Sequence, residues 1–333
     1  MLLIKTKRDN ILTPLQSVCG IVEKRHTLPI LSNVLIEKSG DQLTWLATDI
    51  EIQIRTHTAG AAGADKTAVT VGARKLQDIL RSLPDSAEVS LELSEKRMQV
   101  KAGKSRFNLQ TLPAEDYPRM SQAESEQVRL QLTQKQFKRL IGLVQYAMAP
   151  QDIRYYLNGL LLVVTGNEVR VVATDGHRLA YASEQIEEAQ SRTEVILPRK
   201  TILELSRLLS DNDDVLDIRL SPNQAQFRFG DIELVSKLID GKFPDYERVI
   251  PQSHNKVITL PRTMLLQSLH RAAILTNEKF RGVRLVLAPG LDFDLMPGMT
   301  SASQYDTTVP HAWKAGAQTR LLRNQLLAMP DWQ

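Results

Sequence analysis

An internal repeat constrains the fold of this chain more than any other feature of its sequence. Residues 31–35 (LSNVL) align with residues 157–161 (LNGLL), and the tripeptide Ala-Thr-Asp occurs at 47–49 and again at 173–175. Both alignments have the same offset of 126 residues. A fixed period of this length predicts a tandem array of similar folding units rather than one large domain.

We divide the 333 residues into three expected units, at 1–126, 127–252 and 253–333. Polar segments at 120–127 and 251–255 separate one unit from the next. The third unit begins like the second, because VITL near its start resembles the apolar alternation that opens the second unit. The chain therefore has the organisation of a three-domain repeat protein.

Apolar residues alternate in some segments of a unit and follow helical spacing in others. Ile50, Ile52 and Ile54 alternate with polar residues, which predicts a strand with one face in water. Leu76 and Leu80 have the spacing of one helix face. The segments with helical spacing are 8–25, 73–83, 133–148, 198–210 and 261–276. We predict an α+β fold of repeated domains, each with two helices packed on antiparallel sheets.

The charge is distributed unevenly along the chain. The net charge is only +4, but lysine and arginine outnumber aspartate and glutamate in each of the five expected helices. Such helices can simply be solvated surfaces, since lysine and arginine are good helix formers. Repeated units that place equivalent basic helices on one face would instead form a surface for phosphates, without sequence preference. Lys135, Lys138 and Arg139 of the third helix are the candidates for phosphate contacts.

Several classes of function are disfavoured by the residues present. No nucleophile motif such as G-x-S-x-G occurs, and the six histidines show no metal-ligand spacing. We therefore expect no catalytic residue, no metal and no cofactor. No apolar run reaches the roughly 18 residues of a membrane span, so we expect no membrane partner. A single cysteine, Cys19, cannot form an internal disulfide, and we expect a cytoplasmic location.

A family resemblance appears in several motifs that occur in order along the chain. The motifs are TLPILSN at 27–33, RYYLNG at 154–159, ATDGHRL at 173–179, DGKFPDY at 240–246 and NEKFRG at 277–282. Together they resemble the bacterial DNA polymerase III β sliding clamp from residue 1 to about residue 289. The resemblance implies a DNA-clamp fold and a head-to-tail homodimer that closes into a ring around duplex DNA. It also implies a non-catalytic processivity subunit that tethers the replicative polymerase and other partners.

The resemblance further implies three groups of site residues. Positions that match DNA contacts of the family are Arg25, Gln151, Tyr155 and Tyr156. The family has a hydrophobic cleft for short linear peptides of the polymerase, the clamp loader and repair proteins. Its matching positions here are Arg154, Leu157, Thr174, Gly176, His177, Arg178, Leu179, Pro244, Arg248 and Val249. The subunit interface matches Lys75, Arg106, Phe107, Ile274 and Leu275.

The chain departs from the family pattern in its tail, at 291–333. This tail lacks the alternation of a half-buried strand, offers a helical pattern at 317–329, and contains no counterpart of the C-terminal strand that walls the peptide cleft. An alternative reading follows: a truncated or divergent clamp-derived protein that cannot close a ring. Such a protein would act only as a peptide-binding or regulatory fragment, or have no function, and its cleft would be only partly formed.

Overall fold

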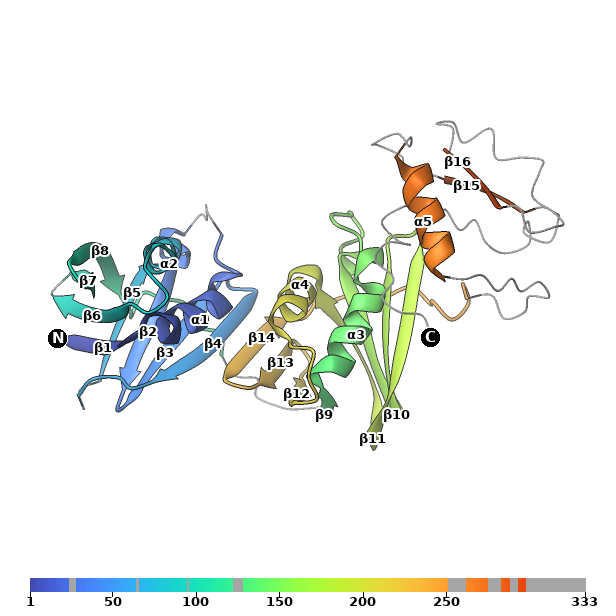
Figure 1. Ribbon diagram of the computed structural model, residues 1–333. Helices are drawn as coiled ribbons and strands as arrows, with labels where there is room; N and C mark the ends of the chain where they lie inside the picture. Colours follow the sequence, from blue (N-terminus) through green and yellow to red (C-terminus); the bar gives the residue numbers. More distant parts are fainter. Residues whose placement is uncertain are drawn as a thin grey trace.

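The structure is a computed structural model. It describes residues 1–23, 28–63, 66–94, 96–121, 128–250, 262–274, 283–287 and 293–297. Within these residues five α-helices lie against antiparallel strands (Figure 1). None of the described helices is long and apolar enough to cross a membrane. The predicted α+β class is confirmed.

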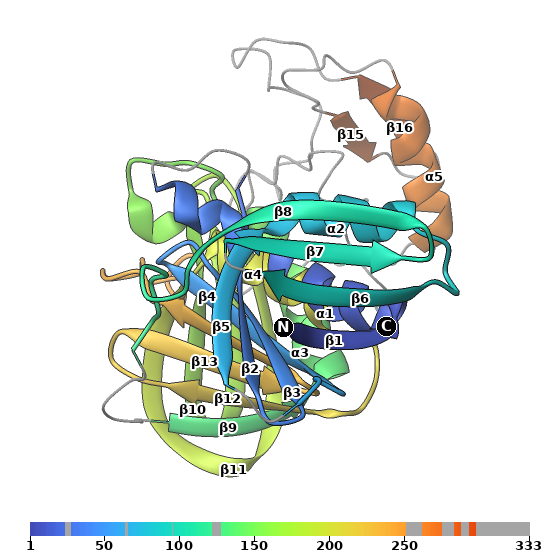
Figure 2. The ribbon, with the colours of Figure 1, turned by 90° about the vertical axis from the view of Figure 1, so that its left-hand side faces the viewer.

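The first repeat places one helix after its first strand and another after its fifth. Its elements are β1 (Leu2–Lys7), α1 (Arg8–Cys19), the 3-10 helix η1 (Pro29–Ser32), β2 (Asn33–Ser39), β3 (Gln42–Thr48), β4 (Ile52–Ala59), β5 (Thr67–Gly72), α2 (Ala73–Ser82), β6 (Glu88–Ser94), β7 (Arg97–Ala102) and β8 (Ser105–Pro113). Figure 2 shows β6, β7 and β8 lying across β2, β3 and β5, so that this repeat has two sheet layers.

The second repeat has the same plan. Its elements are β9 (Val128–Thr133), α3 (Gln134–Val144), the 3-10 helices η2 (Gln145–Ala147) and η3 (Tyr155–Leu157), β10 (Gly159–Thr174), β11 (Leu179–Pro198), α4 (Arg199–Leu208), β12 (Val215–Leu220), β13 (Gln224–Phe229) and β14 (Ile232–Lys237). A capping box starts α3, because the Thr133 hydroxyl accepts from Gln136 N at 3.1 Å and Gln136 Oε1 accepts from Thr133 N at 2.9 Å.

Strand pairing reproduces the sequence repeat at the level of single residues. Pairs at the same positions of the two repeats are Val34↔Val71 with Leu160↔Leu197, and Ala47↔Ile54 with Ala173↔Ala180. The long strands β10 and β11 thus contain the counterparts of β2 to β5. Gly166 (φ 55°) interrupts their register, and its counterpart Gly40 (φ 62°) forms the turn between β2 and β3. Both turns need a left-handed residue, which glycine supplies at little cost.

The two repeats are joined edge to edge. One twelve-stranded sheet runs in the order β1-β6-β7-β8-β5-β2-β3-β4-β14-β13-β12-β9, and the joint is the antiparallel pair β4–β14. Figure 1 shows α1, α3 and α4 in front of the strands. The helices of both repeats therefore lie on the same side of the molecule.

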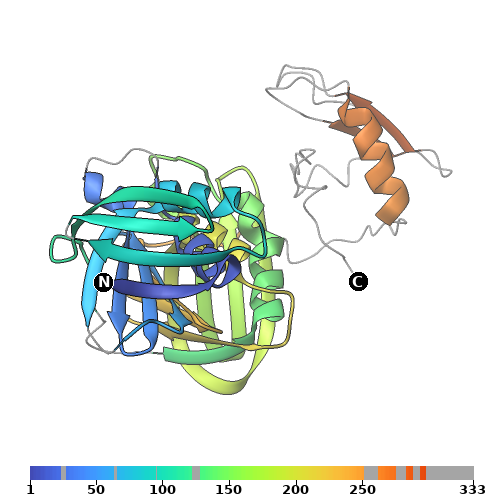
Figure 3. The same ribbon diagram turned by 60° about the vertical axis from the view of Figure 1, so that its left-hand side comes forward.

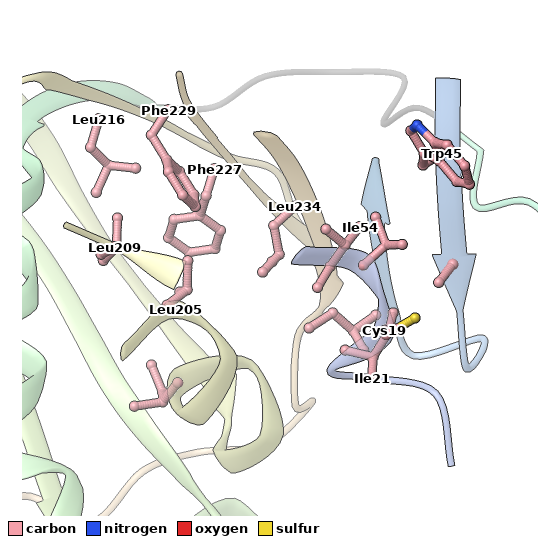
Figure 4. Close-up of a cluster of buried hydrophobic side chains, with 14 of the residues drawn as sticks. Cys19, Ile21, Trp45, Ile54, Leu205, Leu209, Leu216, Phe227, Phe229 and Leu234 are labelled. Carbon is pink, nitrogen blue, oxygen red and sulfur yellow. The ribbon is translucent and has the colours of Figure 1, made fainter. Parts of the chain in front are cut away.

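A hydrophobic core fills the space between these helices and the sheets and continues through the joint. Phe137 of α3 and Phe227 of β13 are fully buried, with ring centroids 5.9 Å apart. Leu234 of β14 is buried beside them and pairs in register with Ile54 of β4. Figure 4 shows Leu234 between Phe227 and Ile54. The joint is therefore held by apolar burial as well as by backbone hydrogen bonds.

The predicted helices all occur, with ends that differ by a few residues. The fifth, α5 (Arg262–Ala273), packs against β15 (Val283–Leu287) and β16 (Phe293–Pro297), as Figure 3 shows. The expectation that the tail lacks a strand was wrong, because β16 lies within it and pairs antiparallel with β15. At five residues, β16 is too short for alternation to stand out in the sequence. The helical pattern at 317–329 lies outside the described residues.

Candidate functional site

A tight turn follows the Ala-Thr-Asp tripeptide of the second repeat. The Thr174 hydroxyl donates to Arg178 O at 2.6 Å and accepts from Gly176 N at 3.1 Å. Asp175 Oδ1 accepts from the backbone N–H groups of His177 at 2.9 Å and Arg178 at 3.0 Å. The two polar side chains thus satisfy the turn's backbone groups and hold it in one shape.

The first repeat contains the same turn. Thr48 Oγ1 donates to Ile52 O at 2.9 Å and accepts from Ile50 N at 3.0 Å. Asp49 Oδ1 accepts from the N–H groups of Glu51 and Ile52. Ile50 is the counterpart of Gly176 and has φ 80°, where Gly176 has φ 86°. Ile50 was predicted to lie in a strand, but β4 begins only at Ile52, because the Thr and Asp side chains close a turn around Ile50.

Replacing Ile50 with asparagine is expected to stabilise the protein by about 0.5 to 1 kcal/mol. A left-handed conformation costs about 1–2 kcal/mol for residues other than glycine, and asparagine tolerates it better than a β-branched residue. The reverse change, Gly176→Ile, is expected to destabilise by more than about 2 kcal/mol for the same reason. Urea unfolding of both variants tests the pair. A clear loss of stability in Ile50→Asn would mean that packing of the isoleucine side chain outweighs the backbone strain.

Arg154 lies directly over the turn of the second repeat. A Cβ atom at Gly176 would be only 3.0 Å from both terminal nitrogens of the Arg154 guanidinium. Arg154 Nη2 also donates to Asp175 O at 3.3 Å, and to Asp152 Oδ2 at 2.8 Å. The hydrogen bonds from Arg154 lower the pKa of Asp152 to about 2. The guanidinium therefore reaches the turn because residue 176 has no side chain.

A linker after β14 packs on the sheet face opposite to the helices. Leu161 and Val163 of β10 point away from the helix side, since their neighbours in sequence belong to the helix-facing core. Phe243 and Tyr246 of the linker are buried against this face together with Leu157. We call this group the linker cluster; its buried members are Ala149, Leu157, Leu161, Val163, Val172, Ile196, Phe243 and Tyr246.

The ten expected cleft residues lie on three segments: η3 with its preceding loop, the Thr-Asp turn, and the linker. Leu179 is half-buried and packs against the linker cluster. On the linker, Pro244, Arg248 and Val249 are exposed, and Arg248 Nε lies 2.8 Å from Asp245 Oδ2. The structure thus brings half-buried Leu179, a fixed arginine and exposed linker side chains to one region above the buried linker cluster.

Ion pairs and a cation–ring contact join the elements around this region. Arg170 lies between Glu168, at 2.8 Å, and Glu247 of the linker, at 3.2 Å. Burial raises the pKa of Tyr246, so the phenol stays neutral at physiological pH. Arg178 lies 5.8 Å from the ring centre of Tyr146. These contacts hold the linker and the turn against the same sheet.

The expected DNA-contacting residues are partly exposed. Gln151 is exposed, Tyr155 has 57% of its surface exposed, and Tyr156 is half-buried. The two tyrosine rings meet edge to face, with centroids 5.8 Å apart. Gly241 of the linker approaches Tyr155, because a Cβ there would lie 3.4 Å from its ring. Arg25 lies outside the described residues.

On helix α3, Lys135 and Arg139 are exposed, whereas Lys138 is half-buried. Lys138 Nζ donates to Leu209 O at 2.8 Å, just after the end of α4. Cations stabilise the C-terminal end of a helix, where carbonyl groups lack intrahelical partners. Lys138 therefore has a structural contact that the charge pattern did not predict.

Several other helix cations also make structural contacts. Arg74 donates to Val22 O at 2.6 Å, and its counterpart Arg199 donates to Met148 O at 3.2 Å. Arg207 of α4 donates to Ser17 O at 2.8 Å, across the joint between the repeats. The excess of lysine and arginine in the expected helices therefore includes side chains that are held by contacts within the protein.

The joint carries ion pairs that the sequence did not indicate. Lys200 of α4 contacts Asp49 and, at 2.9 Å, Glu23 of the first repeat. Arg55 of β4 lies 3.1 Å from Glu233 of β14. The residues of each pair are far apart in the chain, so no local spacing marks them.

The expected subunit-interface residues lie near an open strand edge. Ser105–Gln110 of β8 pair with β7 on one side, and no described strand pairs with the other side. Arg106 is exposed on this strand, Phe107 is half-buried, and Lys75 is exposed on α2. Ile274 has 77% of its surface exposed, and Leu275 lies outside the described residues.

Two α+β repeats joined edge to edge, with all their helices on one side, define a DNA-clamp fold. Family models agree: that of the DNA polymerase III beta subunit N-terminal domain matches residues 2–121, and that of the central domain matches residues 131–245. The beta sliding clamp of Pseudomonas aeruginosa is 46% identical over 286 residues, covering 86% of this chain and 78% of that protein. The chain belongs to the bacterial DNA polymerase III beta subunit family.

Other relatives and solved structures agree. The beta sliding clamp of Escherichia coli is 45% identical over 282 residues, covering 85% of this chain and 77% of that protein. A Pseudomonas aeruginosa DnaN sliding clamp bound to griselimycin superposes with a TM-score of 0.83 at 44% identity, covering 88% and 79% of the two chains. For Caulobacter crescentus pol III beta the TM-score is 0.79 at 40% identity, with 89% and 80% covered. The resemblance inferred from the motifs is confirmed.

Proposed function

We propose that this chain is a DNA sliding clamp, the processivity subunit that encircles duplex DNA and tethers the replicative polymerase. The observation that carries the proposal is the edge-to-edge joining of equivalent repeats with their helices on one side. Repetition of that joint around an axis would close a ring with the helices toward the hole. A protein of this kind performs no chemistry, and it acts in the cytoplasm, where bacterial DNA is replicated.

Ring closure would use the open edge of β8. β8 is the counterpart of β14, and Phe107 corresponds to Leu234, which is buried at the joint beside Ile54. We infer that the third unit of a second copy covers β8, with Lys75 and Arg106 beside the contact and Ile274 and Leu275 on the opposite copy. Pairing of this edge would remove exposed strand hydrogen-bonding groups.

Inside the ring, DNA would be held by weak contacts to its backbone. Lys135 and Arg139 are exposed on α3, Gln151 is exposed on the loop before η3, and Tyr155 is exposed at the start of η3. Contacts of this kind carry no base information and allow sliding. Retention would come from the closed ring rather than from affinity.

Partners would bind at the region formed by η3, the Thr-Asp turn and the linker. An apolar floor bordered by a few fixed polar groups is typical of sites that take a short peptide. Half-buried Leu179, backed by the buried linker cluster, supplies the apolar surface, and Arg154 supplies a fixed donor. We infer that short linear peptides of the polymerase, the clamp loader and repair proteins bind here.

Retention on circular DNA tests the clamp function. The chain is expected to be a dimer by light scattering, and to remain on a nicked circular plasmid after loading but to leave once the plasmid is cut. A monomer that binds peptide but is never retained on circles would favour the fragment reading instead.

Replacing Lys135 and Arg139 with alanine is expected to weaken the salt-dependent contact with DNA without unfolding the chain. Loss of two phosphate contacts should lower the slope of log affinity against log salt by about two. Lys138 is left unchanged because it caps α4. A matched control is Lys5→Ala with Arg97→Ala, which removes the same charge from exposed strand positions. Equal salt slopes for the two double variants would contradict the assignment of α3 to the DNA side.

A further inference from the structure

Asp152 is the one acidic residue in the loop that carries the expected DNA contacts Gln151 and Tyr155. It forms a two-point contact with Arg154: Arg154 Nε donates to Asp152 Oδ1 at 3.0 Å, and Nη2 donates to Oδ2 at 2.8 Å. The backbone N–H of Arg154 adds a third bond to Oδ1 at 2.8 Å. Two-point contacts fix both the distance and the orientation of a guanidinium.

The loop around this pair is itself held in place by Asn158. Asn158 Oδ1 accepts from Asp152 N at 2.7 Å, and Asn158 Nδ2 donates to Asp152 O at 2.9 Å. Asn158 O in turn accepts from Arg199 N at the start of α4. The backbone of Asp152 is therefore anchored to the start of α4 by bonds that do not involve Arg154, and the carboxylate extends from this anchored position.

Arg154 extends from this anchor to the Thr-Asp turn. Its guanidinium covers the α-carbon of Gly176 and donates to Asp175 O at 3.3 Å. The side chain is 46% exposed, and that of Asp152 is 23% exposed. A long side chain that is this exposed would sample many rotamers, and holding it in one of them costs conformational entropy. Because Asp152 already holds Arg154 in one rotamer, a binding peptide does not have to restrict this side chain.

We propose that Asp152 and Arg154 form one element shared by the two sites: Asp152 is the positioning residue that holds Arg154 in the wall of the peptide cleft, and Arg154 neutralises Asp152 on the loop that faces DNA. The proposal rests on the proposed clamp function and deepens it. Nothing in the family resemblance assigned a role to Asp152; the role follows from the contacts of its carboxylate.

The opposite charges of the two residues give the pair a distinct signature. The hydrogen bonds from Arg154 keep the pKa of Asp152 at about 2, so the carboxylate is ionised at every pH used for DNA binding. If Arg154 is removed, an unneutralised negative charge remains beside the phosphates. If Asp152 is neutralised as well, that repulsion disappears, but the cleft still lacks its arginine. The two sites should therefore respond differently to the same set of variants.

Four proteins test this: wild type, Asp152→Asn, Arg154→Ala and the double variant. Each is titrated with a fluorescent peptide carrying the hydrophobic clamp-binding sequence of the family, and each is assayed for its residence on nicked circular DNA. Arg154→Ala should bind peptide about 10-fold more weakly because the cleft loses a charged donor, and Asp152→Asn about 5-fold because the donor is less well held; these factors correspond to about 1.4 and 1 kcal/mol. Arg154→Ala should also leave DNA about 3-fold faster, because of a repulsion of about one unit charge in a wet site.

The double variant decides the question. Its residence on DNA should return to the wild-type value or beyond, while its peptide affinity stays as low as that of Arg154→Ala. A merely structural role for the pair would not produce this recovery. The matched control is Arg192→Ala with Glu194→Gln, a pair on β11 with the same spacing of two residues and a similar hydrogen bond, 3.0 Å from Arg192 Nε.

Two results would overturn the proposal. Full peptide affinity in Asp152→Asn would show that Arg154 needs no positioning, and a double variant that leaves DNA as fast as Arg154→Ala would show that charge neutralisation is not the cause. If wild type bound neither the peptide nor circular DNA, the proposed function would fail and this inference with it. Wild-type binding with either of the first two results would reject the inference alone.

Discussion

Replacing Leu179 with aspartate is expected to weaken binding of a hydrophobic linear peptide by about 30- to 100-fold. The change removes up to about 2–3 kcal/mol of apolar contact and adds a charge that must be desolvated when the peptide binds. Leu179 is half-buried at the start of β11 and packs against the linker cluster. It also follows the Thr-Asp turn directly, where Arg154 is fixed. A bound peptide would cover the part of the leucine that is now in water.

Fluorescence anisotropy with a labelled peptide measures this effect. The fold should survive, because Leu179 is only partly buried and pairs with Thr174 through its backbone. Val215→Asp is the matched control, since Val215 starts β12 with 56% of its surface exposed. Titration curves that coincide for wild type and Leu179→Asp would show that the peptide does not bind at this region.

Replacing Phe227 with alanine is expected to lower the free energy of unfolding by about 3–5 kcal/mol, the usual cost of deleting a buried phenylalanine. Phe227 is fully buried, contacts the ring of Phe137, and pairs in register with Leu234. The loss is a large fraction of a typical stability of 5–15 kcal/mol. Because the core continues through Leu234 to Ile54, the cavity would also weaken the joint.

Urea unfolding followed by tryptophan fluorescence measures this loss. In a background with Trp313 and Trp332 replaced by phenylalanine, the remaining Trp45, which is buried in the first repeat, reports on whether the damage crosses the joint. Arg228→Ala, on the next residue and the opposite face of β13, is the control and should cost less than about 1 kcal/mol as a partly exposed ion pair with Glu233. If Phe227→Ala shifted the midpoint no more than this control, the core described here would not be the main source of stability.

The expected helices and most strands could be read from the sequence because their signals are local. Leu76 and Leu80 recur at helical spacing, and both are fully buried on α2. Ile52 and Ile54 alternate, and both are buried on β4. Ile50 follows the same alternation but lies in a turn, because the hydroxyl of Thr48 and the carboxylate of Asp49 compete for the backbone that a strand would use.

The candidate site was predicted less completely. The family motifs pointed to Arg154 and Gly176, but they did not show that the Arg154 guanidinium packs against Gly176. The sequence assigned no role to Asp152. Its contact with Arg154 matters because Arg154 also donates to Asp175, which lies 21 residues further along the chain. The sequence also gave no reason to single out Gly241, because its importance depends on the close approach of the Tyr155 ring.

The repeat, the α+β class and the apolar face of each element follow from the sequence, because residue periods of 2 and 3.6 depend only on the local backbone. Which charged side chains stay exposed and which hold the protein together depends on the tertiary structure. Lys200 meets Asp49 across 151 residues, and Arg207 meets Ser17 across 190. These side chains become neighbours only when the two folded repeats pair through β4 and β14.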